Sequence, residues 1–93
     1  MVIVQIRDGH SSCTLSAELQ PGGDLVVRGH DEYGYVYTVR GAAVAQMCAL
    51  LDVEHGDLVD GLQRLLAPSG VTAGAAWRTW LKTHDVPYQL TVH

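Results

Sequence analysis

The sequence predicts a single α+β domain over residues 1–93: a four-stranded antiparallel sheet with three helices on one face, and a C-terminal strand that returns to the sheet. Two observations lead to this prediction. Apolar residues recur at every second position through the first part of the chain, and then at every third or fourth position. Alternation returns in the last residues, so the expected order is β-β-β-β-α-α-α-β.

The strands are expected over residues 2–7, 12–20, 24–29 and 35–40. The turn Pro21-Gly22-Gly23 predicts a three-residue hairpin loop, because proline suits its first central position and Gly23 can adopt a left-handed conformation. This loop would pair Gln20 with Asp24 and fix the register of the second and third strands. The predicted facing pairs are Leu19 with Leu25, Ala17 with Val27 and Leu15 with Gly29.

Helical spacing begins after Gly41 and is interrupted twice. The first helix would place Val44, Met47, Cys48 and Leu51 on one side. A second helix is expected over residues 57–67, ended by Pro68-Ser69-Gly70, and a third over residues 72–84. The third helix carries Trp77 and Trp80 on its apolar side, as core packing or, alternatively, as the lining of a pocket or interface. A last strand is expected over residues 88–92.

Composition limits the classes of partner. The net charge of −4, with six lysines and arginines in 93 residues, argues against a broad nucleic-acid surface. Neither a long apolar span nor a signal sequence is present, so we expect a cytoplasmic protein that does not bind membranes. In that compartment Cys13 and Cys48 are expected to be free thiols rather than a disulfide.

No pattern for catalysis or metal binding is found. His10, Cys13 and His30 supply too few ligands for a zinc site, so no metal and no cofactor is expected. Cys48 falls on an apolar helical stripe, where a thiol acts as a small hydrophobe rather than a nucleophile. The acidic cluster between the first two helices suits a solvated helix boundary better than a carboxylate pair; it comprises Asp52, Glu54, Asp57 and Asp60. We therefore expect a protein that is not an enzyme.

The sheet face turned away from the helices is the candidate interface. If Val4, Leu15, Val27 and Tyr37 face the helices, an apolar centre rimmed by arginines faces outward. Its predicted members are Ile3, Arg7, Val26, Arg28, Val36 and Arg40. An ordinary solvated face is the alternative interpretation. An RNA-binding sheet would need the opposite register, with Tyr35 and Tyr37 outward as stacking platforms.

Three stretches carry a resemblance: AELQPGGDLVV at residues 17–27, YVYTV at 35–39 and WLKTHDVPY at 80–88. They resemble segments of small uncharacterised proteins of GC-rich, actinobacteria-like bacteria. The resemblance implies strands, helices and a final strand, and it carries over no activity and no site residues. In its size and acidity the chain is also similar to bacterial immunity and inhibitor proteins.

These observations favour a non-enzymatic protein-binding module, of the immunity or inhibitor type, that binds a protein partner or itself through the outer sheet face. A second hypothesis is a small-ligand or anion-binding protein that uses Arg7, Arg28 and Arg40 of that face.

Overall fold

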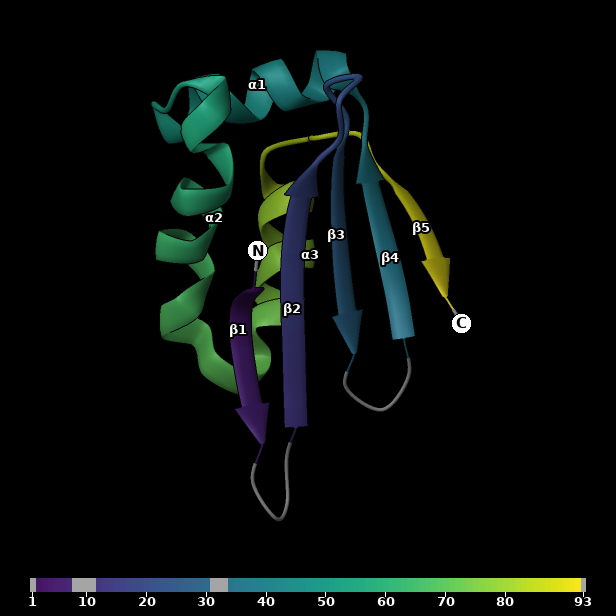
Figure 1. Cartoon of the computed structure of the whole chain (residues 1–93), viewed down its shortest axis with the longest axis vertical. Helices are drawn as coiled ribbons and strands as arrows, with labels where there is room; N and C mark the ends of the chain where they lie inside the picture. The colour runs from purple at the N-terminus through teal and green to yellow at the C-terminus, as the bar shows by residue number, and fades with distance from the viewer. Residues whose placement is uncertain (1, 8–11, 31–33, 93) are drawn as a thin grey trace.

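The computed structural model describes residues 2–7, 12–30 and 34–92, and of residues 4, 6, 7, 12 and 13 it describes the backbone alone. A five-stranded antiparallel sheet forms one layer, with the strands in the order β1-β2-β3-β4-β5 (Figure 1). The strands are β1 (Val2–Arg7), β2 (Ser12–Leu19), β3 (Leu25–His30), β4 (Gly34–Val39) and β5 (Gln89–Val92). The predicted α+β class is confirmed, and the C-terminal strand joins the sheet beside β4.

The hairpin between β2 and β3 has the predicted register. Leu19 pairs with Leu25, and the Gln20 N–H donates to the Asp24 carbonyl at 2.7 Å. Gly23 has a φ of 96°, a conformation that glycine adopts without a steric penalty. Turn chemistry and alternation agree here, so the apolar residues of both strands lie on the same face.

The first strand departs from strict alternation. Val2 pairs with Ser16 and Val4 pairs with Leu15, so a β-bulge inserts Ile3 between two ladder positions. As a result Ile3 turns toward the helices and is only 4% exposed. The prediction that Ile3 lies on the outer face is therefore wrong, because a bulge shifts side chains to the opposite face.

The helices form a second layer on one face of the sheet, which we call the inner face, and leave the opposite, outer face uncovered by helices (Figure 1). It consists of α1 (Gly41–Leu51), η1 (His55–Asp57), α2 (Leu58–Leu66), η2 (Ala67–Thr72) and α3 (Ala73–Thr83). α1 crosses the end of the sheet at which the β2–β3 hairpin turns, α2 runs beside β1, and α3 lies behind the sheet. The predicted stop at Pro68-Ser69-Gly70 is a kink rather than a long loop, since 3-10 turns lie on both sides of Gly70, whose own backbone is not helical (φ 56°, ψ −126°).

The start of α1 is tied to the hairpin. Asp24 accepts a 2.9 Å hydrogen bond from the Gly41 N–H, one of the donors that a helix N-terminus leaves without an intrahelical partner. The Arg40 side chain makes no such cap itself, and its Nη1 lies 3.3 Å from the Asp24 carboxylate. A carboxylate 17 residues upstream therefore caps this helix.

The core lies between the inner sheet face and the helices. Among the described residues no polar or charged side chain is buried. The larger side chains that are fully buried are Leu15, Leu25, Val27, Val39, Val44, Met47, Leu58, Leu62, Leu66, Trp77 and Leu81. Tyr35 and Tyr37 also face inward, as expected from their place in the alternation.

Candidate functional site

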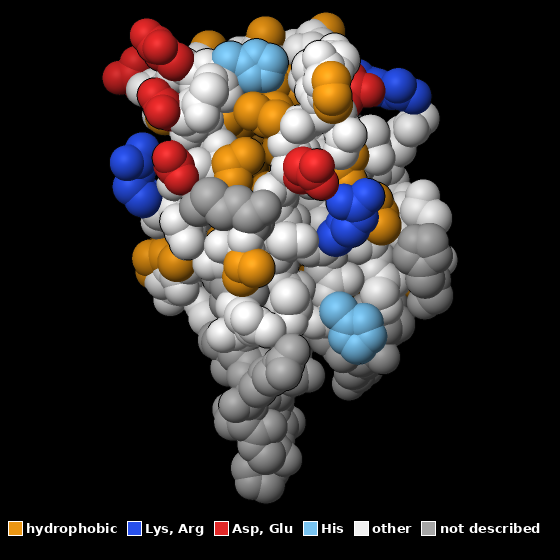
Figure 2. Space-filling model, in the orientation of Figure 1, with side chains coloured by type: hydrophobic (Ala, Val, Ile, Leu, Met, Phe, Trp, Pro, Cys, Tyr) orange, Lys and Arg blue, Asp and Glu red, His pale blue; other side chains and the backbone are white. Residues whose placement is uncertain are grey.

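The outer sheet face brings together part of the predicted interface. Strand register aligns Ser16, Arg28 and Val36 in one row across β2, β3 and β4. In the next row Val26 pairs with Thr38, so Val26 and Val36 are diagonal neighbours on adjacent strands. Both valines are half-buried by their neighbours within the sheet. Figure 2 views this face, on which uncharged atoms predominate.

Among the side chains that the structure describes, the charges on this face are sparse and balanced. Arg28 Nη1 lies 3.7 Å from Glu18 Oε2, and the two side chains are 56% and 62% exposed. An ion pair this exposed contributes little to stability, since water and salt screen it. It does leave the middle of the face electrically neutral.

Two of the remaining predicted members, Ile3 and Arg40, lie away from this group. Arg40 follows β4 at the end of the sheet, where it pairs with Asp24. The Arg7 side chain lies outside the described residues, as do residues 8–11 and the Cys13 thiol. Of the six predicted interface residues, Val26, Arg28 and Val36 therefore form one patch, which we call the outer patch.

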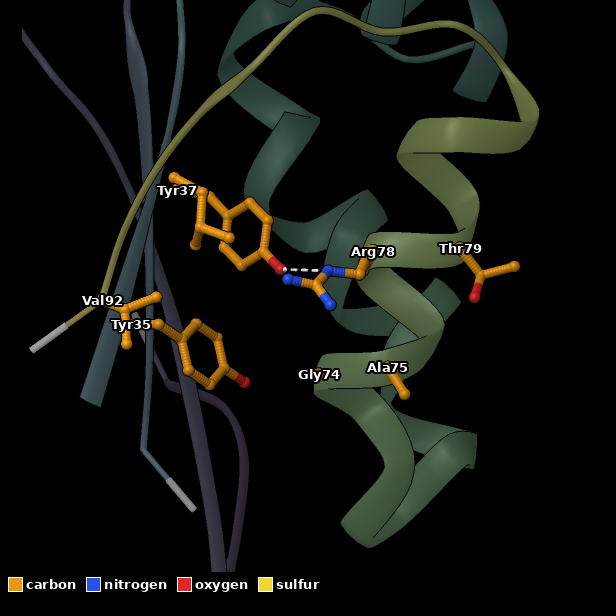
Figure 3. Close-up of a pocket in the computed structure, with 8 residues that line it drawn as sticks. Tyr35, Tyr37, Gly74, Ala75, Arg78, Thr79 and Val92 are labelled. Atoms are coloured by element: carbon orange, nitrogen blue, oxygen red, sulfur yellow. Dashed lines mark hydrogen bonds between the residues drawn. The ribbon is translucent and has the colours of Figure 1, made fainter. Parts of the chain in front are cut away.

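A second candidate site lies on the inner side of the sheet. Between α3 and the β4–β5 pair is an open pocket of about 270 Å³ (Figure 3). The residues that line it are Tyr35, Tyr37, Gly74, Ala75, Arg78, Thr79, Leu90 and Val92. We call this the α3–β5 pocket.

Two glycines make room for the Tyr35 ring beside this pocket. Gly29 pairs with Tyr35 across β3 and β4, and a Cβ at Gly29 would overlap the tyrosine ring. A Cβ at Gly74 of α3 would overlap the Tyr35 hydroxyl. Tyr35 therefore lies over one strand and against the helix at the same time, and a side chain at either glycine would require the Tyr35 ring to shift.

Arg78 connects α3 to the sheet. Its Nε donates a 3.2 Å hydrogen bond to the Tyr37 hydroxyl, and Figure 3 shows the guanidinium between Tyr37 and Tyr35. The Tyr37 ring is held in turn by aromatic contacts to Trp77, Tyr88 and Tyr35, with centroids 6.1, 5.3 and 5.6 Å apart. Such contacts stabilise a defined ring orientation, so the hydroxyl that holds Arg78 is itself fixed.

The two tryptophans form part of the same aromatic cluster. Trp77 is fully buried and stacks on Trp80, with centroids 6.2 Å apart and ring planes 8° apart. The core interpretation of Trp77 is confirmed. Its indole N–H is buried without a hydrogen-bond partner among the described residues. Trp80 is half-buried and contacts the His84 ring at 4.8 Å.

The other chemical candidates form no site. Cys48 is a free, half-buried thiol, and burial raises its pKa above the ordinary value, which makes it a poorer nucleophile. Asp52, Glu54, Asp57 and Asp60 are all exposed. Within residues 2–7, 12–30 and 34–92, no three histidine, cysteine or acidic side chains gather as metal ligands would. His10 and the Cys13 side chain lie outside that search.

Sequence reasoning did not identify Arg78. The available signal was weak: Gly74, Ala75 and Arg78 stand among the apolar positions of the third helix, on the part of its surface that does not pack into the core. Whether these residues lie near Tyr37 and Val92 depends on which strand β5 pairs with, and local sequence patterns do not predict that pairing.

Comparison with models of known protein families, with curated proteins and with solved structures finds no match for this chain. None of the described helices has both the length and the apolar character needed to cross a bilayer.

Proposed function

We propose that this protein is a non-enzymatic binding module that recognises another protein through the outer patch of Val26, Arg28 and Val36. The observation that carries the proposal is the one-sided arrangement of the fold: the helices lie behind the sheet, beside β1 and across one end of the sheet, and none of the described residues covers the outer face. The small size and acidity suit an inhibitor or immunity type of protein, which acts by occupying a surface of its target.

The chemistry of the outer face favours a protein over a nucleic acid. Tyr35 and Tyr37 face inward, so the condition for an RNA-stacking sheet is not met at these residues. The patch presents two valines and a charge pair among hydroxyl side chains, a mixture typical of moderately polar protein interfaces. Its neutrality lets it approach a partner without strong repulsion.

The size of the face sets an expectation for affinity. Five strands about 4.8 Å apart and about 20 Å long give a planar area of roughly 480 Å², or about 1,000 Å² counted on both partners. This value is at the lower limit of specific interfaces, about 1,000–1,200 Å². The described part of the face also lacks the aromatic anchors common in tight interfaces. We therefore expect a transient complex.

The alternative, an anion site built from the outer arginines, receives less support. Arg28 and Arg40 each lie beside a carboxylate, of Glu18 and Asp24 respectively. Arg40 also follows Val36, the partner of Arg28, by four residues, which is about 13 Å along an extended chain.

The test is to charge the patch. We expect Val36→Lys combined with Val26→Lys to abolish partner binding or self-association, because two ammonium groups would have to be desolvated at the centre of the contact. Ala45→Lys on the exposed side of α1 adds a charge away from the patch and serves as the control. Circular dichroism would verify that all variants fold.

The measurement is quantitative affinity capture from lysate, together with sedimentation equilibrium of each variant. A partner, or a dimer, present with the wild type and Ala45→Lys but lost from the double variant would support the proposal. If every captured partner survives in the double variant, or if nothing binds and the wild type stays monomeric, the proposal is wrong.

A further inference from the structure

The two edges of the sheet differ in how they are protected. A helix lies beside the β1 edge: α2 runs along this side, and Gln63 Nε2 donates a 3.4 Å hydrogen bond to the Val2 carbonyl (Figure 1). At the opposite edge, no strand or helix of the described residues lies beyond β5 (Figure 1). A strand edge with unpaired N–H and C=O groups is a template for a further strand. The sheet can therefore be extended at β5.

The register of the sheet identifies which backbone groups of β5 face this open edge. In an antiparallel ladder, alternate residues direct N–H and C=O to one neighbour, and the residues between them direct theirs to the other side. The hydrogen bond that closes the β2–β3 turn fixes this alternation, and no bulge interrupts it between β2 and β5. It assigns the backbone groups of Gln89 and Thr91 to the pairing with β4. The backbone groups of Leu90 and Val92 therefore point outward.

The sequence of β5 does not discourage pairing. Proteins protect exposed edges with charged side chains, prolines or bulges. The four residues of β5 are uncharged, include no proline, and pair with β4 without a register shift. Val92 is 56% exposed, so the edge also presents an apolar side chain to solvent.

The side chains of β5 specify what a further strand must carry. Leu90 and Val92 pair with two inward-facing tyrosines of β4, so both lie on the inner face, where they line the α3–β5 pocket. Thr91 lies between them and faces outward. Because residues that pair across an antiparallel ladder lie on the same face, the added strand needs apolar residues opposite Leu90 and Val92. Between these two it needs a residue that suits a solvated face.

A second copy of β5 meets these requirements. With a twofold axis through Thr91, antiparallel pairing places Leu90 of each copy opposite Val92 of the other. Each such pair exchanges two backbone hydrogen bonds, because the outward N–H and C=O groups meet. Threonine lies opposite threonine on the outer face, a pairing that stabilises sheets. Since β5 is uncharged, its side chains bring no like charges together, and the strand has the self-complementarity that a twofold contact requires.

We infer that two copies of this chain associate edge to edge through β5, which joins their two sheets into one. The contact is short, because four residues extend about 14 Å. It belongs to the small class of interfaces, so we expect a dissociation constant of about 0.1–1 mM. The inference does not depend on the outer patch, which lies on the face of the sheet rather than at its edge.

Dilution of the full chain tests the contact. Between roughly 0.05 and 2 mM, a range that spans the expected dissociation constant, sedimentation equilibrium should show monomer and dimer. Over the same range the amide chemical shifts of Leu90 and Val92 should change most, since their N–H groups gain a partner. The amide shifts of Gln89 and Thr91 should change less, because their N–H groups already bond to β4.

Variants of β5 locate the contact. Val92→Pro removes an N–H that the sheet of one copy does not use, and twofold symmetry removes two intermolecular hydrogen bonds. Association should weaken by about tenfold or more. Val92→Thr keeps the N–H and the β-branched shape, so it is the matched control and should lose less than about threefold.

A charge at the axis gives a second, independent variant. Thr91→Lys would place two ammonium groups opposite each other and should also weaken association, so it remains informative if Val92→Pro fails to fold. Ala45→Lys adds the same charge on the exposed side of α1 and should leave association unchanged.

Several outcomes would overturn the inference. A chain that stays monomeric up to about 2 mM does not pair through this edge. Self-association that is undiminished in Val92→Pro or in Thr91→Lys uses another surface. Self-association that is lost in the Val26→Lys, Val36→Lys double variant but retained in Val92→Pro would belong to the outer patch instead.

Discussion

The Tyr35 ring of β4 lies directly over Gly29, its paired residue in β3, and its hydroxyl touches Gly74 of α3. An aromatic side chain laid across a strand glycine shields backbone that glycine alone would leave uncovered. In this fold the same ring also sets how closely the helix can approach the sheet. Two backbones separated by 45 residues in the sequence therefore share one aromatic side chain.

This relationship predicts the effect of one added methyl group. Gly29→Ala should lower the free energy of unfolding by about 1–3 kcal/mol, because the new Cβ would displace a packed ring. Urea denaturation would measure it. Gly56→Ala is the matched control: a Cβ there meets no atom within 4 Å, so its effect should stay within about 0.5 kcal/mol. If Gly29→Ala costs as much in a Tyr35→Ala background, the ring is not the cause.

Asp24 should stabilise α1 as a cap. Asp24→Ala removes the acceptor for the Gly41 N–H and should cost about 1 kcal/mol. Asp24→Asn keeps an acceptor oxygen and loses only the attraction to the exposed Arg40, so it should cost less than half as much. Equal losses in the two variants, measured by urea denaturation, would show that charge rather than capping is responsible.

Trp77 and Trp80 are expected to differ in their contribution to stability. Trp77→Ala should cost about 3–5 kcal/mol, since the indole is fully buried, whereas the half-buried Trp80 should cost about half as much. Trp77→Phe should be milder than Trp77→Ala, because it keeps an aromatic ring and removes the buried N–H that has no partner among the described residues. Circular dichroism in urea would rank the three variants, and a Trp80 loss equal to that of Trp77 would contradict the packing described.

The Cys48 thiol should be protected by folding. Burial raises its pKa, so alkylation of the Cys48 peptide between about pH 7 and pH 9 should be slower in the native protein than in urea. Mass spectrometry separates this peptide from that of Cys13.

The same raised pKa links stability to pH. The folded state favours the protonated thiol, so this contribution is fully present below the pKa of the unfolded thiol and is lost as pH rises through the higher folded pKa. Cys48→Ala should therefore lose less stability than the wild type over that alkaline interval. An identical pH dependence in both proteins would show that burial of Cys48 contributes nothing.

Local chemistry accounts for what the sequence could predict. The Pro21-Gly22-Gly23 turn specifies its own loop length, and loop length specifies which residues of β2 and β3 pair. The inward direction of Tyr37 followed from alternation within β4. The bulge at Ile3 carries no glycine or proline signal, because it arises from how β1 meets β2. A prediction from strict alternation therefore assigns Ile3 to the wrong face of the sheet.

The α3–β5 pocket could not be predicted for a related reason. Its polar contact joins Tyr37 to Arg78, 41 residues apart, and its mouth is lined by Val92 of the last strand. Periodicity predicts which positions of a helix are buried and which are exposed, but it does not predict which strand the helix will pack against. The three residues of the outer patch belong to neighbouring strands of a meander, so their proximity followed from register alone.

The placement of β5 has a consequence for synthesis on the ribosome. β1 to β4 pair with their neighbours in chain order, so this meander can assemble while the helices are still being translated. The free edge of β4 then waits for a strand encoded about fifty residues later, since Thr38 pairs with Gln89. During that interval an exposed strand edge can capture a strand from another nascent chain. Rapid translation and docking of the three helices would shorten this exposure, so codon choice after position 40 is expected to affect the yield of monomer.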